Sequence, residues 1–415
     1  MKILHLCGGS LESGATRGAL ALHQSLLDLG VESSLIFSKG ENTTNTQNAS
    51  PFFKSPLTRQ LFDKSLKWIE PAILKHEAKR KVRGLSIGMI GHPFLLKKDI
   101  IQAADVIHLH WINSRFLRIK VIQHFKKPIV WTMRDAWPYT GGCHYTNDCM
   151  RYRVGCGECP LVGTLDTKDR TNQVIQDKQN CLPRGIRYIA LSNWTAEQAR
   201  SSYLLKDESI EVIENCINEL YLSPSDSTQT AAREQFNLPK DKVIILAGAV
   251  RIDSKYKGYT EVLPALSAPN ASNIHLVTFG RISESLKNQI TIPSTHLGSI
   301  SSSQELKALY YAANLFIAPS TQEAFGKTLA EAGASGLPVI CYDAGGPKDI
   351  VIHEVTGLKI PLNDTNTFAH ATISLAQNRE QQQRMGRAAI KHIANNFSPI
   401  IVAKKYMELY QRLEA

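Results

Sequence analysis

The segment from Pro319 to Gly346 constrains the fold most strongly, because its pattern predicts a complete strand–loop–helix–strand unit. The apolar run 314–318 predicts a buried strand that stops at Pro319. Strong helix formers follow the loop, and this helix ends at Gly336, before a second apolar run at 339–342. A helix that joins two buried strands indicates a parallel sheet, and ligands bind beyond the carboxyl ends of such strands.

Two carboxylates flank the loop of this unit. Glu323 precedes the helix, and Glu331 lies eight positions later, about 12 Å away along the axis if the whole segment is helical. Between them, the backbone N–H groups around Phe325, Gly326 and Thr328 form a helix N-terminus, which favours an anion. This order suits a nucleotide-sugar, which has hydroxyl groups on both sides of a diphosphate. The alternative is that Glu331 lies on a solvent-exposed helix face.

The same residues resemble a known family. Glu323 and Glu331, with Phe325-Gly326 between them and Gly-Leu-Pro-Val at 336–339 after them, are similar to the signature of retaining GT-B glycosyltransferases of family 4. The resemblance implies that Glu323 faces the donor sugar and that Glu331 binds the ribose hydroxyls. It also implies an α/β fold of the GT-B type, in which two Rossmann-like, doubly wound domains face each other across a cleft.

The chain length of 415 residues predicts two domains of about 200 residues each. Apolar strands alternate with helices in the first half, which predicts a parallel sheet with helices on both faces. We expect strands at 3–7, 34–37, 106–110, 129–133 and 188–191, and a polar loop at 40–55. The expected domains are an acceptor-binding domain at 1–220, a nucleotide-sugar-binding domain at 221–398, and a helix at 399–415 that packs back on the first domain, as the resemblance implies.

Further donor-binding residues are expected at strand ends. Arg251 and Lys257 follow the apolar strand 242–250 beside a Gly turn, and two such cations suit a diphosphate. The resemblance implies that both contact the donor phosphates, and we assign catalysis to them together with Glu323. It also implies that Gly14 belongs to a Gly-containing loop that closes over the donor phosphates. Ordinary loop charges and a plain helix-start loop are the alternatives at these positions.

Candidate acceptor residues follow two strands of the first domain. His110 and Asn113 follow one strand, and Arg134 and Asp135 follow the next, where the carboxyl ends of a doubly wound sheet face the ligand. His108 is interpreted equally well as a satisfied interior histidine. Family members commonly have a His before the Asp, where this chain has Arg134. Arginine stays protonated and cannot act as a base, but the resemblance implies that the leaving phosphate serves as the base.

Four of the eight cysteines fall in an insert at 140–160, with the spacing C-x5-C-x6-C-x2-C. In a cytoplasmic protein such a cluster favours a metal site over disulfides. Four thiolates form a closed tetrahedral zinc site that is structural and not catalytic, and the expected ligands are Cys143, Cys149, Cys156 and Cys159. Two disulfides or free thiols remain open. The insert resembles a Cys-rich loop of a subset of bacterial surface-polysaccharide transferases.

The net charge of +11 comes from the N-terminal half. Residues 1–200 hold 28 Lys and Arg against 16 Asp and Glu, whereas residues 201–415 hold 20 against 21. This asymmetry predicts an anionic partner, and we find no nucleic-acid-binding motif in the sequence. The segment 57–83 mixes apolar residues with a dense set of cations, which favours an anionic membrane surface. The alternative, of nearly equal weight, is a helix that packs its apolar face on the core and exposes its basic face to solvent.

No apolar run reaches the roughly 18 residues that span a bilayer, and the first nine residues are too short for a signal-peptide core. We therefore expect a cytoplasmic enzyme that is peripheral on the inner face of the plasma membrane. The predicted reaction transfers a sugar, with retention, from a nucleotide diphosphate-sugar to a lipid-linked glycan acceptor in bacterial surface-polysaccharide biosynthesis. The sequence has no Asp-x-Asp motif, so no catalytic metal is expected. The alternatives are a GT-B sugar-phosphate synthase with a soluble acceptor and a catalytically silent nucleotide-sugar-binding protein.

Overall fold

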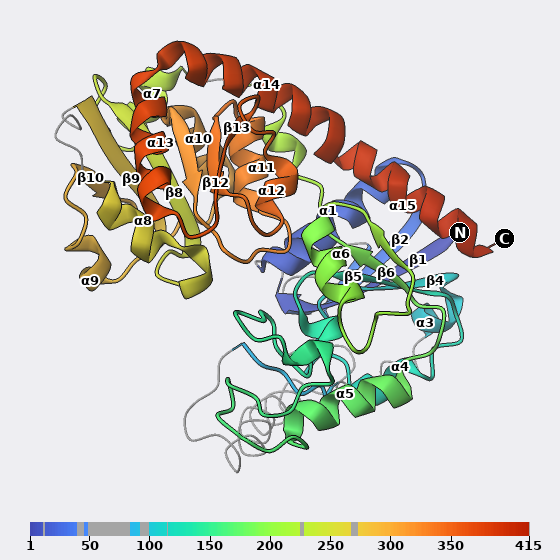
Figure 1. Ribbon diagram of the computed structural model, residues 1–415. Coiled ribbons are helices and arrows are strands. Elements are labelled where there is room, and N and C mark those ends of the chain that lie inside the picture. Colours follow the sequence, from blue (N-terminus) through green and yellow to red (C-terminus); the bar gives the residue numbers. More distant parts are fainter. Residues whose placement is uncertain are drawn as a thin grey trace, which may run out of the picture. The chain divides into compact units, whose positions relative to one another are not determined.

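The computed structural model describes residues 1–10, 13–39, 45–48, 84–91, 99–113, 115–224, 228–266 and 273–414. The chain divides into two compact units, which are unit 1 (residues 1–214 and 403–415) and unit 2 (residues 215–402). Each unit contains one sheet with helices around it (Figure 1). The segment 57–83, for which membrane binding is predicted, lies outside the described residues.

Unit 1 contains a seven-stranded sheet with the order β3-β2-β1-β4-β5-β6-β7, and every neighbouring pair is parallel. Its strands are β1 (Lys2–Ser10), β2 (Glu32–Lys39), β3 (Thr46–Asn48), β4 (Val106–Leu109), β5 (Ile129–Met133), β6 (Arg187–Ala190) and β7 (Ile210–Val212). Its helices are α1 (Gly14–Asp28), α3 (Asp99–Ala103), α4 (Ile119–Ile122), η3 (Trp137–Tyr139), η4 (Arg151–Arg153), α5 (Arg170–Cys181) and α6 (Asn193–Arg200).

Unit 2 contains a six-stranded sheet with the order β10-β9-β8-β11-β12-β13, again with parallel neighbours throughout. Its strands are β8 (Val243–Arg251), β9 (Ile274–Arg281), β10 (Ser294–His296), β11 (Leu315–Ala318), β12 (Val339–Tyr342) and β13 (Gly357–Ile360). Its helices are η5 (Glu219–Tyr221), α7 (Gln229–Gln235), η6 (Lys255–Lys257), α8 (Tyr259–Ala265), α9 (Glu284–Lys287), α10 (Ser303–Ala312), α11 (Lys327–Ala334), α12 (Pro347–Ile350), α13 (Thr365–Gln377) and α14 (Arg379–Phe397). Helix α15 (Pro399–Glu414) runs from unit 2 into unit 1.

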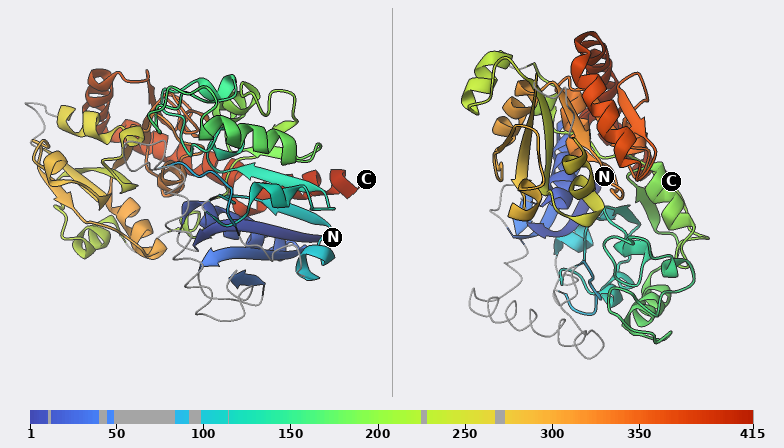
Figure 2. Two further views of the ribbon diagram at one scale, coloured as in Figure 1. Left: turned by 90° about the horizontal axis from the view of Figure 1, so that it is seen from below. Right: turned by 60° about the vertical axis from the view of Figure 1, so that its left-hand side comes forward.

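The predicted α/β architecture is confirmed, because the apolar runs of the sequence form the central strands. Strands β4, β5, β11 and β12 are buried along their whole length, as is usual for parallel strands that carry helices on both faces (Figure 2). One prediction was wrong in part: the polar segment 40–55, expected to be a loop, includes the edge strand β3, which pairs with β2.

The C-terminal helix contributes to the core of unit 1 through residues 403–415. The Tyr406 hydroxyl lies 2.9 Å from Thr132 Oγ1, and the Tyr410 hydroxyl lies 2.6 Å from His108 Nδ1, all of them buried. Arg412 near the end of α15 pairs with Glu211 at 2.6 Å. Polar contacts therefore fix α15 on this unit. Among the described residues, none of the helices is both long and apolar enough to cross a membrane.

The strand order places a topological switch point in each sheet. In unit 1 it lies between β1 and β4, and in unit 2 it lies between β8 and β11. Open parallel sheets bind ligands beyond the carboxyl ends of the strands at such points. The residues that follow β4, β5, β8 and β11 are therefore the candidates for function.

Candidate active site

An ion pair lies at the switch point of unit 2. Lys257 ends the short helix η6 after β8, and Glu323 lies in the loop after β11. Nζ of Lys257 donates to Oε2 of Glu323 at 2.9 Å, and the two side chains are 16% and 20% exposed. The pair is shielded from most water but remains accessible to a ligand. Two predicted donor-site residues that are 66 positions apart are thus in direct contact.

Glycines allow close backbone contacts in the loops that carry Lys257 and Glu323. Gly258, next to Lys257, has φ +67°, and a Cβ there would lie 2.0 Å from the carbonyl oxygen of Pro319. The backbone N–H of Gly346 donates to the carbonyl of Glu323 at 2.7 Å. Any side chain at Gly258 would push the Lys257 turn away from the strand end that leads to Glu323. The close approach of the Lys257 turn to the end of β11 therefore depends on Gly258.

The loop continues into the N-terminus of α11. Gly326 precedes the helix with φ +110°, and the first turn, which holds Lys327 and Thr328, contains no acidic residue. The N–H groups of this turn therefore favour an anion, as the sequence predicts. Phe325 is 4% exposed and packs edge-on against the ring of Phe397, with centroids 5.6 Å apart. Its contribution in this structure is to anchor the loop.

Glu331 is buried in α11 and is only 4% exposed. Its Oε2 accepts a hydrogen bond from the Tyr310 hydroxyl at 3.2 Å, and its Oε1 lies 3.6 Å from Nζ of Lys327. The alternative of a solvent-exposed helix face is therefore wrong. Burial, with the neighbouring Glu331 carboxylate, raises the pKa of Tyr310 well above its usual value. Tyr310 consequently remains a hydrogen-bond donor to this carboxylate.

Arg251 has a more open environment than Lys257. It is the last residue of β8, its side chain is 51% exposed, and its Nε donates to Oδ1 of Asp253 at 2.9 Å. The predicted contact with a donor phosphate therefore requires the guanidinium to turn away from Asp253 or to share its donors.

Gly14 opens helix α1 in unit 1, after the N-cap residue Ser13. A Cβ at Gly14 would meet no atom within 4 Å, so its surroundings do not demand glycine. A Cβ at Gly9, by contrast, would lie 2.2 Å from Ser13 Oγ and 2.4 Å from Thr16 Oγ1. The close packing in this loop therefore occurs at Gly9, which the sequence analysis did not single out, and the phosphate role of Gly14 stays a prediction.

Asp135, just after β5, accepts hydrogen bonds from several neighbours. Its Oδ2 accepts from Nε1 of Trp111 at 2.6 Å and from Nδ2 of Asn113 at 3.2 Å, and its Oδ1 accepts from the backbone N–H of Trp137 at 3.0 Å. Nδ1 of His144 lies 3.6 Å from Oδ2. The predicted residues Asn113 and Asp135 are thus brought together, whereas Trp111 and His144 were not predicted.

Arg134 contacts the other predicted acceptor residue, His110, with its Nε donating to Nδ1 at 3.2 Å. A guanidinium only donates, so His110 carries its proton on Nε2, which lies 2.9 Å from Nδ1 of His5. His5 then carries its proton on Nε2, which has no hydrogen-bond partner within the described part of the chain. Burial, reinforced by neighbouring charges that include Arg134, holds the pKa of His5, His108 and His110 well below 6.5.

His108 has a partner at both ring nitrogens, Tyr410 at 2.6 Å and Thr132 at 2.8 Å, which confirms its interpretation as a satisfied interior histidine. Within the described ranges, His5, His108 and His110 are the one group of three His, Cys, Asp or Glu residues whose ligand atoms lie within 4.8 Å of one another. The hydrogen bond between His5 and His110, the contacts of His108 with Tyr410 and Thr132, and the adjacent Arg134 account for this cluster as a polar network of neutral histidines.

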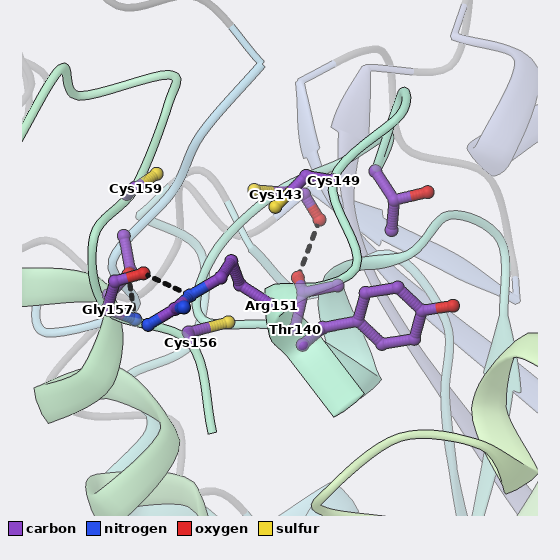
Figure 3. Close-up of a pocket in the computed structure, with 10 residues that line it drawn as sticks. Thr140, Cys143, Cys149, Arg151, Cys156, Gly157 and Cys159 are labelled. Carbon is purple, nitrogen blue, oxygen red and sulfur yellow. Dashed lines mark hydrogen bonds between the residues drawn. The ribbon is translucent and has the colours of Figure 1, made fainter. Parts of the chain in front are cut away.

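The four predicted cysteine ligands line one pocket in unit 1 (Figure 3). All eight cysteines lie in described parts of the chain, and each is a free thiol. The disulfide alternative therefore does not describe this structure.

Comparison with known proteins identifies the class of enzyme. Residues 228–392 match the family model described as Glycosyl transferases group 1. The chain is 23% identical over 381 residues to WcaC of Escherichia coli K12, named as a colanic acid biosynthesis glycosyl transferase, and the match covers 85% of each protein.

Solved structures show the same fold. Sucrose-phosphate synthase of Thermosynechococcus elongatus is 21% identical with a TM-score of 0.68, over 100% of this chain and 99% of that one. Anabaena HepE in complex with UDP-glucose is 15% identical with a TM-score of 0.62, over 99% and 100%. The fold is therefore GT-B, as predicted, and the chain is a glycosyltransferase.

Proposed function

We propose that this glycosyltransferase transfers a sugar, with retention of anomeric configuration, from a nucleotide diphosphate-sugar to a lipid-linked glycan in bacterial surface-polysaccharide biosynthesis. The observation that carries the proposal is the Lys257–Glu323 pair beside the N-terminus of α11, with the buried Glu331 eight residues further on. A cation, a helix N-terminus and a buried carboxylate match the diphosphate and ribose of such a donor.

The donor diphosphate would lie against Lys257 and the first N–H groups of α11. Negative charge grows on this group as its bond to the sugar breaks, and donors already in place stabilise it most effectively. Because Glu323 pairs with Lys257 at 2.9 Å, an incoming diphosphate competes with this carboxylate and frees it to face the donor sugar. Arg251 supplies a second cation, so the proposal assigns no catalytic metal. HepE, which shares the fold and was solved with UDP-glucose, supports this class of donor.

The acceptor would lie at the carboxyl ends of β4 and β5 in unit 1. Asp135 and Asn113 present a hydrogen-bonded pair there, and Arg134 is held against the neutral ring of His110. In the proposed mechanism the leaving phosphate takes the proton of the acceptor hydroxyl, so Arg134 does not need to act as a base. The named role of WcaC in colanic acid biosynthesis supports a surface-polysaccharide acceptor.

A donor screen tests this proposal. UDP-, GDP-, ADP- and dTDP-sugars are added in turn, and unfolding is followed by thermal shift. The correct donor at 100 times its Kd should add about 2.7 kcal/mol to the free energy of unfolding. Transfer is then compared between lipid-linked glycans and soluble sugar phosphates. If no donor stabilises the protein, the proposed donor class is wrong, and transfer to soluble sugar phosphates alone would favour the sugar-phosphate synthase alternative.

Glu331→Gln is expected to weaken nucleotide binding by about tenfold and to change kcat little, because it removes a charged acceptor for the ribose hydroxyls. Gln retains an acceptor for the Tyr310 hydroxyl, whereas Ala would leave that hydroxyl buried without its partner. Calorimetric Kd values for the nucleoside diphosphate are compared with kcat. Glu305→Gln, an exposed carboxylate on α10, is the control. A lower kcat with unchanged affinity would contradict the ribose role.

Salt-sensitive binding to anionic vesicles is expected, and it rests on the charge excess of residues 1–200. Each Lys or Arg near an anionic leaflet contributes about 1 kcal/mol, and the attraction acts over a Debye length of about 10 Å at 0.1 M salt. Co-sedimentation should be strong at low salt and lost at high salt. Replacing Lys75, Lys79, Arg80 and Lys81 with Gln should reduce it without changing donor hydrolysis. Equal binding to neutral and anionic vesicles, or no binding to either, would contradict a membrane role for the segment 57–83.

A further inference from the structure

The loop that connects η3 to α5 in unit 1 brings four thiols to one pocket. Cys143, Cys149, Cys156 and Cys159 all line this pocket (Figure 3). We propose that the four thiolates bind one structural zinc ion, and that the metal holds the segment 140–171 in its folded form. This site is separate from the donor residues of unit 2, so its test does not depend on the proposed reaction.

The backbone N–H of Gly141 donates to the sulfur of Cys156 at 3.3 Å. The backbone N–H of Gly157 donates to Thr171 Oγ1 at 3.2 Å, and that of Cys159 donates to Oδ2 of Asp169 at 3.0 Å. These hydrogen bonds fix the turn between Cys156 and Cys159 against the start of α5, beside the pocket.

The turn after Cys156 has an unusual backbone. Cys156, Gly157 and Glu158 have φ values of +59°, +84° and +45°. A Cβ at Gly157 would lie 2.1 Å from the carbonyl oxygen of Thr167, so glycine is required there. Left-handed backbone costs a non-glycine residue about 1 kcal/mol or more, and such strain persists where the surroundings hold it. A metal bound at both ends of the turn would supply that restraint.

One basic side chain, that of Lys178, lies beside the charge that the site would carry. Four thiolates around a divalent ion have a net charge of −2. Lys178 is fully buried, its ammonium lies 3.9 Å from the centre of the Trp137 ring, and it donates to the carbonyls of Trp137 and Thr140. These hydrogen bonds join α5 to Thr140, which lines the thiol pocket.

The donor set fits zinc. Four thiolates are a common ligand set of structural zinc, whereas Mg²⁺ and Ca²⁺ prefer oxygen. In the described residues no three cysteine sulfurs lie within 4.8 Å of one another. Binding would therefore draw the sulfurs inward to Zn–S distances of about 2.3 Å.

The position of the pocket gives the metal an indirect influence on the acceptor residues. Cys143 accepts a hydrogen bond at its carbonyl from Thr140 Oγ1 at 2.9 Å. The next residue, His144, lies 3.6 Å from Asp135 and accepts at its carbonyl from the N–H of Ala136 at 3.0 Å. Ordering the cysteine loop would thus also hold His144 beside Asp135.

Metal analysis of protein purified under reducing conditions from zinc-containing medium tests the site. We expect about one zinc ion per chain. Cys143→Ser and Cys159→Ser should lose it, and Cys181→Ser, a partly buried cysteine at the end of α5, should keep it. Cobalt added to the metal-free wild-type protein should give the charge-transfer bands and intense d–d bands of tetrahedral thiolate coordination, which needs no variant to fold. Chelation should expose the segment 140–171 to limited proteolysis, and added zinc should restore protection.

Protein without zinc, together with cobalt spectra that lack thiolate bands, would overturn the proposal. Mass-mapped disulfides among the four cysteines in the reductively purified protein would overturn it as well. Equal zinc content in Cys143→Ser, Cys159→Ser and the wild type would show that the metal lies elsewhere.

Discussion

Lys257→Ala is expected to lower kcat/KM for donor turnover by roughly 100-fold, because it removes a preorganised cation from the leaving diphosphate. Lys257 is only 16% exposed, so its charge is less screened than that of a surface lysine. The loss should be larger in kcat than in donor affinity, since the charge on the diphosphate increases as the bond breaks. Steady-state kinetics with the donor from the screen measure both quantities. Arg251→Ala should cost more than tenfold by the same reasoning.

Lys255→Ala is the matched control, because Lys255 lies in the same 3₁₀ turn but is exposed. Thermal unfolding of each variant separates loss of activity from loss of fold. Wild-type kcat/KM in Lys257→Ala would mean that the diphosphate binds elsewhere.

Glu323→Gln is expected to lower kcat by roughly 100-fold while leaving the affinity for the nucleoside diphosphate unchanged or higher. The carboxylate competes with the diphosphate for Lys257, because the two side chains are 2.9 Å apart. Removing its charge frees Lys257 for the ligand but takes the negative group away from the reacting sugar. A lower kcat with undiminished affinity distinguishes this role from a structural one, in which kcat and affinity would both fall.

Calorimetric Kd values and single-turnover rates of the same preparation provide the comparison for Glu323→Gln. Gln322→Ala, at the neighbouring position of the same loop, controls for disturbance of the loop. A large loss of affinity with unchanged turnover would contradict the assignment of Glu323 to the donor sugar.

Much of the fold was predictable because buried parallel strands leave a clear pattern. The run 315–318 and the run 339–342 are continuous apolar segments bounded by Pro and Gly, and they form β11 and β12. The edge strand β3 was missed because its residues Thr46–Asn48 are polar, so it has no hydrophobic signature. The spacing of Glu323 and Glu331 located the loop and helix, but the burial of Glu331 depends on Tyr310, which lies 21 positions away.

The parts of the site that could not be predicted involve partners that are distant in sequence. The contact between Lys257 and Glu323 spans 66 positions, and that between Trp111 and Asp135 spans 24. Local periodicity places each residue on a strand end or loop, but the register of the sheet decides which strand ends meet. The network of His5, His108 and His110 likewise joins β1 to β4, and no spacing rule relates His5 to the other two.

Proton NMR of donor hydrolysis by the purified protein tests the central claim most directly. The enzyme is incubated with the α-linked nucleotide diphosphate-sugar that stabilises it, and the first anomer released is observed before mutarotation. We predict the α-anomer together with an equal amount of nucleoside diphosphate, and loss of both in Lys257→Ala. Release of the β-anomer first, or of sugar phosphate with nucleoside monophosphate, would contradict retaining transfer from the site at Lys257 and Glu323.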